Sequence, residues 1–96
     1  MDVIKSFGKK ENGQELWVFH CPGCGYGHPY DVPRWTWNGS TTKPTFTPSL
    51  LVSPDRPQNR CHLFVTDGKI QFCSDSHHKL AGKTVDMIPV DKWYGD

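Results

Sequence analysis

Two apolar runs flank the dipeptide Asp67-Gly68 between Cys61 and Ser74. Asp-Gly readily accepts the positive φ angles of a type I′ turn, which joins two strands through a loop of two residues. Short apolar runs on either side of a turn dipeptide are typical of two paired strands. The segment therefore predicts a β-hairpin.

Burial sets the register of this hairpin. A loop of two residues brings two pairs of apolar residues together: Val65 with Ile70, and Leu63 with Phe72. A slip by one residue would place Phe72 opposite His62 and lose both pairs. The favoured register puts His62 across from Cys73 on the opposite face, with Cys61 at the open end of the hairpin.

The rest of the chain is divided by eight prolines and nine glycines into short segments rich in β-branched and aromatic residues. The expected elements are strands over 15–20, 35–38, 49–52 and 84–90, and one helical turn over 76–80 that ends at Gly82. This pattern predicts a small β-rich domain, mostly antiparallel, with little helix.

The length of 96 residues fits a single domain, 1–96, in which residues 1–13 form a peripheral strand or stay flexible. A chain this short buries only about 60–65% of its unfolded surface, so its core needs additional support. Four cysteines and five histidines supply a high density of metal ligands for that purpose.

Charge and hydropathy exclude several classes of function. The net charge is +1, with cations and acids interspersed, so no nucleic-acid partner is expected. We find no apolar run of the kind a secretory signal or a membrane span needs, and we expect a cytoplasmic protein. Thiols stay reduced there, which favours metal ligation; disulfides remain the alternative for an exported chain.

The most specific motif is Cys21-Pro-Gly-Cys24, which has the shape of a zinc knuckle. Two thiolates on one tight turn can reach a tetrahedral zinc ion at about 2.3 Å. A redox pair is the rival interpretation, but no helix follows to lower a thiol pKa. Two more ligands must come from elsewhere, and the candidates are Cys61, Cys73, His28, His62 and His78. Cys73 is equally open to being a plain buried thiol, and His20 and His77 fit surface positions better.

Several motifs occur in an order that resembles a known family. They are the stretch 19–28, Trp37-Asn38-Gly39, the stretch 44–50, Cys61-His62, Asp67-Gly68, Asp75, His78 and the stretch 81–85. Together they resemble a small phage and prophage family whose members often carry the label "ammonia monooxygenase". The family is related to the peptidase component of bacterial ubiquitin-like (Bub-type) operons. A thiolate knuckle does not support an oxygenase, which needs a redox metal with open positions.

The resemblance implies a peptidase that acts on a ubiquitin-like protein in the cytoplasm of the bacterial host. Its recurrent polar positions match Cys21, Cys24, His28, Ser49, Cys61, His62, Asp75 and His78. The chain departs from the family pattern in carrying Cys73, where an apolar residue is usual, and Ser76-His77, where Cys-Thr is common. The implied structural zinc site is Cys21, Cys24, Cys61 and His28, with His78 or Cys73 as alternative fourth ligands.

With that zinc site, Ser49, His62, Asp75 and His78 are left over for catalysis. Ser49 as nucleophile, His62 as general base and Asp75 as the orienting carboxylate have the chemistry of a triad. The alternative for Ser49 is a turn serine bonded to its own backbone. A second catalytic hypothesis makes zinc a Lewis acid held by His62, His78 and Asp75, with water in the fourth position.

Two functional hypotheses follow from this set. The first is a small peptidase or isopeptidase, deubiquitinase-like, with a structural zinc ion. The second is a non-catalytic zinc-binding module that binds a host or phage protein. Four tryptophans in so short a chain suggest that some line a groove for a peptide partner, while others pack around the metal.

Overall fold

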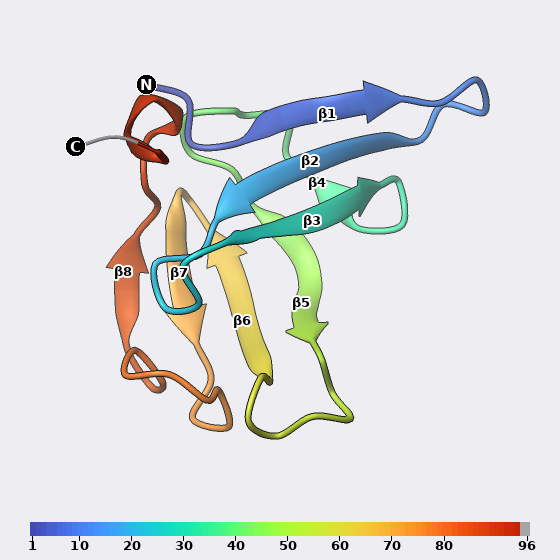
Figure 1. The fold of residues 1–96 in the computed structure, drawn as a ribbon. Coiled ribbons are helices and arrows are strands. Elements are labelled where there is room, and N and C mark those ends of the chain that lie inside the picture. The colour runs from blue at the N-terminus through green and yellow to red at the C-terminus, as the bar shows by residue number, and fades with distance from the viewer. Residues whose placement is uncertain (95–96) are drawn as a thin grey trace.

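The computed structural model describes residues 1–94, which form two antiparallel sheets (Figure 1). The smaller sheet has the order β1-β2-β3 and consists of β1 (Lys5–Lys9), β2 (Glu15–His20) and β3 (Gly27–Val32). The larger has the order β4-β5-β6-β7-β8 and consists of β4 (Thr36–Trp37), β5 (Phe46–Val52), β6 (Cys61–Thr66), β7 (Lys69–Phe72) and β8 (Thr84–Asp86). Within the described residues, the single helix is a 3₁₀ turn over Val90–Lys92. The fold is therefore β-rich and antiparallel, as predicted.

The two sheets pack face to face, and their strands cross at a steep angle (Figure 1). Aromatic residues join them: the Tyr30 ring of β3 stacks on the Phe46 ring of β5, with centroids 4.0 Å apart and planes 4° apart. The ring centroid of Phe19 on β2 lies 5.8 Å from that of Tyr30, and both side chains are buried. The inner face of the larger sheet is thus covered, whereas its outer face is open to solvent.

The predicted hairpin and its register are confirmed. β6 pairs with β7 through Leu63 with Phe72 and Val65 with Ile70, around a turn at Asp67 and Gly68. Both turn residues have positive φ angles, 51° and 76°. Asp and Gly are among the residues that best accept these angles, which explains why Asp-Gly is found at this turn.

Burial along β6 alternates with a period of two. Leu63 and Val65 are fully buried against the core, while Phe64 between them is 40% exposed. The same alternation buries Cys61 completely and turns its neighbour His62 to the outer face. Two adjacent residues of one strand therefore serve opposite faces of the sheet.

The structure corrects several element boundaries. The expected strands over 15–20 and 49–52 are present, but the second begins at Phe46, so Pro48 lies inside it. The strands expected over 35–38 and 84–90 shorten to Thr36–Trp37 and Thr84–Asp86. The prediction of a helical turn over 76–80 was wrong, because these residues form irregular turns.

β3 of the smaller sheet was not predicted, whereas β1 lies within residues 1–13, for which a peripheral strand was one of two expectations. β3 contains Pro29, which is rare in strands, yet its residues alternate in burial and pair with β2 throughout. β1 lies at the edge of the smaller sheet, and the preceding residues Val3 and Ile4 are buried in the core.

The four tryptophans do not form an exposed groove. Trp93 is 7% exposed, and the other three pack partly buried against the core. Trp17 and Trp37 contact each other across the two sheets, with ring centroids 4.7 Å apart. The described residues contain no helix long and apolar enough to cross a lipid bilayer.

A bulge interrupts the pairing of β5 with β6. Phe46 pairs with Val65 and Leu50 with Leu63, so three residues of β5 stand opposite one residue of β6. Such bulges bend a strand and re-aim its side chains. Ser49 is the last residue of the bulge and lies on the outer face near His62.

Candidate functional site

Four ligand atoms converge at one point beneath β6. The sulfurs of Cys21, Cys24 and Cys61 and a ring nitrogen of His28 all lie within 4.8 Å of one another. The first two cysteines come from the tight loop between β2 and β3, and the Cys21 sulfur lies 4.0 Å from that of Cys61 on β6. Within that loop, the Cys24 amide donates to the Cys21 sulfur at 3.4 Å, as in a zinc knuckle. This cluster could hold a metal ion, and it joins the smaller sheet to the larger one.

The three thiols strongly affect one another's ionisation. A hydrogen bond from Cys61, against the opposing effect of burial, lowers the pKa of Cys21 to about 3. Burial, and then the charge of Cys21, raises the pKa of Cys24 to about 11. The hydrogen bond to Cys21, with burial, raises the pKa of Cys61 further still. Burial and the neighbouring charge thus disfavour ionisation of Cys24 and Cys61, whereas a divalent ion would stabilise all three as thiolates.

His28 provides a test of whether a metal fits. Its side chain is 1% exposed, and its Nε2 has no hydrogen-bond partner among the described residues. A buried imidazole without a partner costs about 1–3 kcal/mol. Coordination by the ring would remove that cost, and three thiolates with one imidazole are a donor set typical of a structural zinc site.

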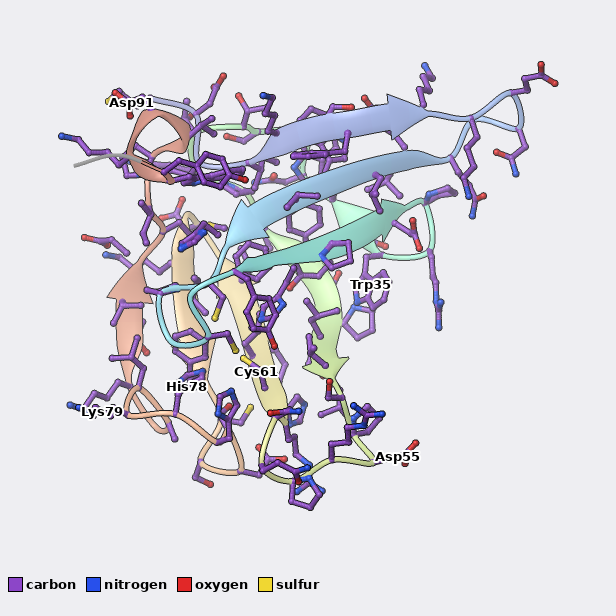
Figure 2. All side chains as sticks on the ribbon, in the orientation of Figure 1. Trp35, Asp55, Cys61, His78, Lys79 and Asp91 are labelled. Carbon is purple, nitrogen blue, oxygen red and sulfur yellow. The ribbon has the colours of Figure 1, made fainter. Side chains whose placement is uncertain are left out.

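His78 lies beside this cluster as a hydrogen-bond donor. Its Nδ1 accepts the Leu80 amide at 3.2 Å, so the neutral ring carries its proton on Nε2, which faces the Cys61 sulfur at 3.4 Å. Burial lowers the pKa of His78 and favours this neutral form. The ring also packs directly on Gly23, where any Cβ would overlap it. Figure 2 shows Cys61 and His78 next to each other between the strands.

A second group of polar side chains occupies the outer face of the larger sheet. The Ser49 hydroxyl oxygen lies 3.2 Å from His62 Nε2. Both carboxylate oxygens of Asp75 lie 3.3 Å from His62 Nδ1. With a carboxylate at Nδ1, the neutral ring carries its proton there and presents Nε2 as an acceptor to the serine. Serine, imidazole and carboxylate thus form one continuous chain of contacts.

Strand β6 belongs to both groups. Cys61 contributes to the buried cluster, and the next residue, His62, contributes to the outer group. Side chains alternate along a strand, so Cys61 and His62 point to opposite faces. Contacts that hold Cys61 on the buried face therefore also hold the backbone that carries His62. The buried cluster therefore supports the outer group through a single peptide unit.

Ser76 is a positioning residue that sequence reasoning missed. Its hydroxyl accepts the His62 amide at 3.0 Å and donates to the His62 carbonyl at 3.0 Å. The Cys73 amide donates to the same carbonyl at 2.8 Å. These bonds attach the loop that carries Asp75 to β6. The only available signal in the sequence was a serine adjacent to an acid, which is too common to identify such a role.

Removing the Ser76 hydroxyl should weaken this attachment. We expect Ser76→Ala to lower the free energy of unfolding by about 1–3 kcal/mol, because the part-buried His62 amide loses its partner and the His62 carbonyl keeps only the Cys73 amide. Urea unfolding followed by tryptophan fluorescence measures the change. Ser74→Ala, in an exposed neighbour, is the matched control. Equal stability of the two variants would contradict the positioning role.

The structure separates the remaining candidate ligands. Cys73, an alternative for the fourth ligand, lies near His62 and Asp75 and not with the other cysteines. His78 lies near Cys61 and not with His62 and Asp75, so the ligand set required for the Lewis-acid hypothesis is not brought together. The exposed His77 lies 3.3 Å from the Cys24 sulfur.

Comparison with known proteins agrees with the resemblance to the ubiquitin-like operons. A family model described as "Bacterial ubiquitination-like system serine protease (BubE)" matches residues 3–73. The matched part contains Ser49 and His62 and ends before Asp75. No curated protein and no solved structure shows a significant match. Because the match covers most of its 96 residues, the chain belongs to the family of bacterial ubiquitination-like system serine proteases (BubE).

Proposed function

We propose that this protein is a serine peptidase that cleaves a peptide or isopeptide bond formed by a ubiquitin-like protein. Ser49 is the nucleophile, His62 the general base and Asp75 the carboxylate that orients the imidazole. The chain of contacts from Ser49 through His62 to Asp75, at 3.2 and 3.3 Å, is the observation that carries this proposal. Membership of a family of serine proteases supports it independently.

The chemistry follows from the positions of these three groups. His62 Nε2 takes the hydroxyl proton as the Ser49 oxygen attacks the carbonyl carbon, and then gives that proton to the leaving amine. Asp75 holds the proton on Nδ1 and stabilises the imidazolium that forms. Water then hydrolyses the acyl-serine by the same route in reverse. The His62 side chain is 27% exposed, so substrate and water can both reach it.

An unpaired edge of β5 could bind the substrate. β4 pairs with β5 only through Thr36 with Thr47 and Trp37 with Phe46. On that side, residues 50–52 have no strand partner within residues 1–94. An extended peptide that adds as a strand to this edge would lie beside Ser49.

Two exposed apolar side chains flank the proposed catalytic histidine. Leu51 pairs directly with His62 across the sheet and is 44% exposed. Phe64 is 40% exposed, and its ring centroid lies 6.2 Å from that of His62. Both are well placed to contact side chains of a bound peptide.

We expect Phe64→Ala to raise the KM for a peptide substrate about tenfold, with a smaller change in kcat, since one aromatic contact contributes about 1–2 kcal/mol of binding. Steady-state kinetics on a fluorogenic peptide measures both constants. Phe7→Ala is the matched control, because Phe7 is similarly exposed, at 55%, on the other sheet. An unchanged KM in Phe64→Ala would rule out this contact surface.

The proposal includes a structural zinc ion held by Cys21, Cys24, Cys61 and His28. Four protein ligands fill a tetrahedral zinc ion and leave no position for substrate, so the ion would hold the two sheets together and take no part in the reaction. His78 would then donate a hydrogen bond to one ligand sulfur, an arrangement that commonly orients metal ligands.

Labelling with a fluorophosphonate tests the proposal directly. This probe reacts with a serine only when a neighbouring base activates it, so intact-mass analysis should show one adduct, located on Ser49 by peptide mapping. Ser49→Ala should abolish the adduct. Ser53→Ala should retain it, because no histidine lies within hydrogen-bond distance of Ser53 in the part of the chain described.

The opposite result would support a different class of function. If Ser49 in folded, metal-loaded protein stays unlabelled, the peptidase proposal fails. The exposed Leu51 and Phe64 would then favour the non-catalytic module that binds a protein partner.

A further inference from the structure

One thiol on the outer face has no part in either proposed site. Cys73 follows β7 and lies directly across from His62, whose carbonyl accepts the Cys73 amide at 2.8 Å. It is half-buried and unoxidised, on the same side of the sheet as the Ser49–His62–Asp75 group. Its sulfur, a ring nitrogen of His62 and a carboxylate oxygen of Asp75 all lie within 4.8 Å of one another.

We propose that His62, Cys73 and Asp75 form a second, exchangeable zinc site, and that a zinc ion bound there blocks the activity of Ser49. The metal-binding part of this inference does not depend on the proposed function. The inhibitory part does, because it assumes that His62 acts as the base for Ser49.

The three side chains suit a zinc ion in kind and in spacing. Thiolate, imidazole and carboxylate are all common zinc ligands. Nitrogen and oxygen ligands bound at about 2.0–2.1 Å stand about 3.3 Å apart around a tetrahedral ion. In the structure, His62 Nδ1 lies 3.3 Å from each Asp75 oxygen. A small movement of Cys73 would complete three ligands, with water in the fourth position.

A zinc ion bound to either ring nitrogen of His62 would prevent this imidazole from acting as the base for Ser49. On Nδ1, it displaces Asp75 from the ring, and the neutral imidazole must then carry its proton on Nε2, where it cannot accept the proton of Ser49. An ion bound to Nε2 instead occupies the lone pair that would accept the proton of Ser49. In both cases the thiol proton of Cys73 goes to solvent, and Ser49 loses its activation.

This site should bind zinc more weakly than the buried cluster. It has three protein ligands, and the side chains of His62 and Asp75 are 27% and 45% exposed. The buried cluster has four, of which Cys21, Cys61 and His28 are fully enclosed. Exchange with the surrounding zinc pool would therefore switch activity without unfolding the protein.

The test measures metal content and Ser49 reactivity separately. Protein that retains its tightly bound zinc after dialysis is equilibrated with buffered free zinc, and bound zinc per chain is measured by atomic emission. We expect about one additional zinc per chain in the wild type and none in Cys73→Ala or Cys73→Val, because three ligands become two. Ser74→Ala should behave like the wild type, and melting curves identify any variant that is misfolded.

Fluorophosphonate labelling is then followed with and without that zinc. At free zinc about ten times the Kd of the second site, mass action leaves about one tenth of the chains unbound, so wild-type labelling should slow about tenfold. In Cys73→Ala, the labelling rates with and without the added zinc should be nearly equal. Cobalt in place of the second zinc should add a thiolate-to-metal absorption band that depends on Cys73.

Each outcome has a distinct meaning. No additional zinc in the wild type, or equal additional zinc in Cys73→Ala, overturns the second site. Additional zinc that leaves the labelling rate unchanged overturns the inhibitory role. If Ser49 is unlabelled even without added zinc while Cys73-dependent zinc still binds, the peptidase proposal fails and the metal site stands.

Discussion

Replacing Ser49 with alanine is expected to lower the kcat for cleavage of a ubiquitin-like fusion by about 10⁴-fold or more, since no nucleophile remains to form the acyl intermediate. The fold should be unaffected, because the Ser49 side chain lies on the outer face and contributes nothing to the core. Gel analysis of the cleaved fusion measures the rate, and circular dichroism checks the fold. Ser53→Ala, in the turn that follows β5, is the matched control.

Asp75→Asn separates catalysis by a triad from catalysis by serine and histidine alone. The amide cannot hold the proton on His62 Nδ1 as a carboxylate does, so kcat should fall by about 10³-fold, with KM little changed. The Asp75 side chain is 45% exposed, and water can replace part of its effect. Asp86→Asn on β8 makes the same change in a carboxylate that pairs with Lys69. Equal activity of the two variants would remove Asp75 from the mechanism.

Removal of the metal is expected to unfold the protein. A structural zinc ion contributes about 10–16 kcal/mol in small zinc domains, which equals or exceeds the total stability of about 5–15 kcal/mol typical of a domain. The cluster here joins the β2–β3 loop to β6, and three thiols would otherwise be held together with unfavourable ionisation. Elemental analysis should find a bound ion, and a strong chelator should abolish the cooperative melting transition.

Cysteine variants provide the controls for that experiment. Cys21→Ser and Cys61→Ser should lose the tightly bound ion and fold poorly, because each removes one of its four proposed ligands. Cys73→Ser makes the same substitution outside the cluster and should keep both the tightly bound ion and the melting temperature. A chelated, metal-free protein with an unchanged melting temperature would show that the core alone stabilises the fold.

The hairpin was predictable because everything that specifies it is local. Asp67-Gly68 accepts the turn, and the apolar residues on either side can all be buried in one register only. β3 was not predictable on the same grounds. Its Pro29 and initial Gly27 are signals against a strand, and it forms because β2 pairs along its whole length and buries His28 and Tyr30.

The failed helical turn over 76–80 shows tertiary contacts overriding local preference. The Ser76 hydroxyl binds both backbone groups of His62, and the His77 amide donates to the Arg60 carbonyl at 2.8 Å. These contacts fix the backbone of Ser76 and His77 against β6 in irregular turns. The loop instead follows β6 and brings Asp75 to His62.

The identities of Ser49, His62 and Asp75 as candidates came from the family resemblance and not from their spacing. No local pattern marks a serine after Pro48 as a nucleophile. The bulge in β5 brings Ser49 to His62, and it becomes visible only when that strand is paired with β6.

The sequence by itself determined the β-rich class, the cysteine knuckle and the hairpin that sets Cys61 and His62 on opposite faces. Each of these depends on neighbours in the chain, through alternation and turn chemistry. Tertiary structure alone decided which side chains meet. Ser49 and His62 are separated by 13 residues, and Cys21 and Cys61 by 40. Contacts over such distances depend on how both sheets pack, on the bulge in β5 and on the Ser76 attachment, and local preference specifies none of these.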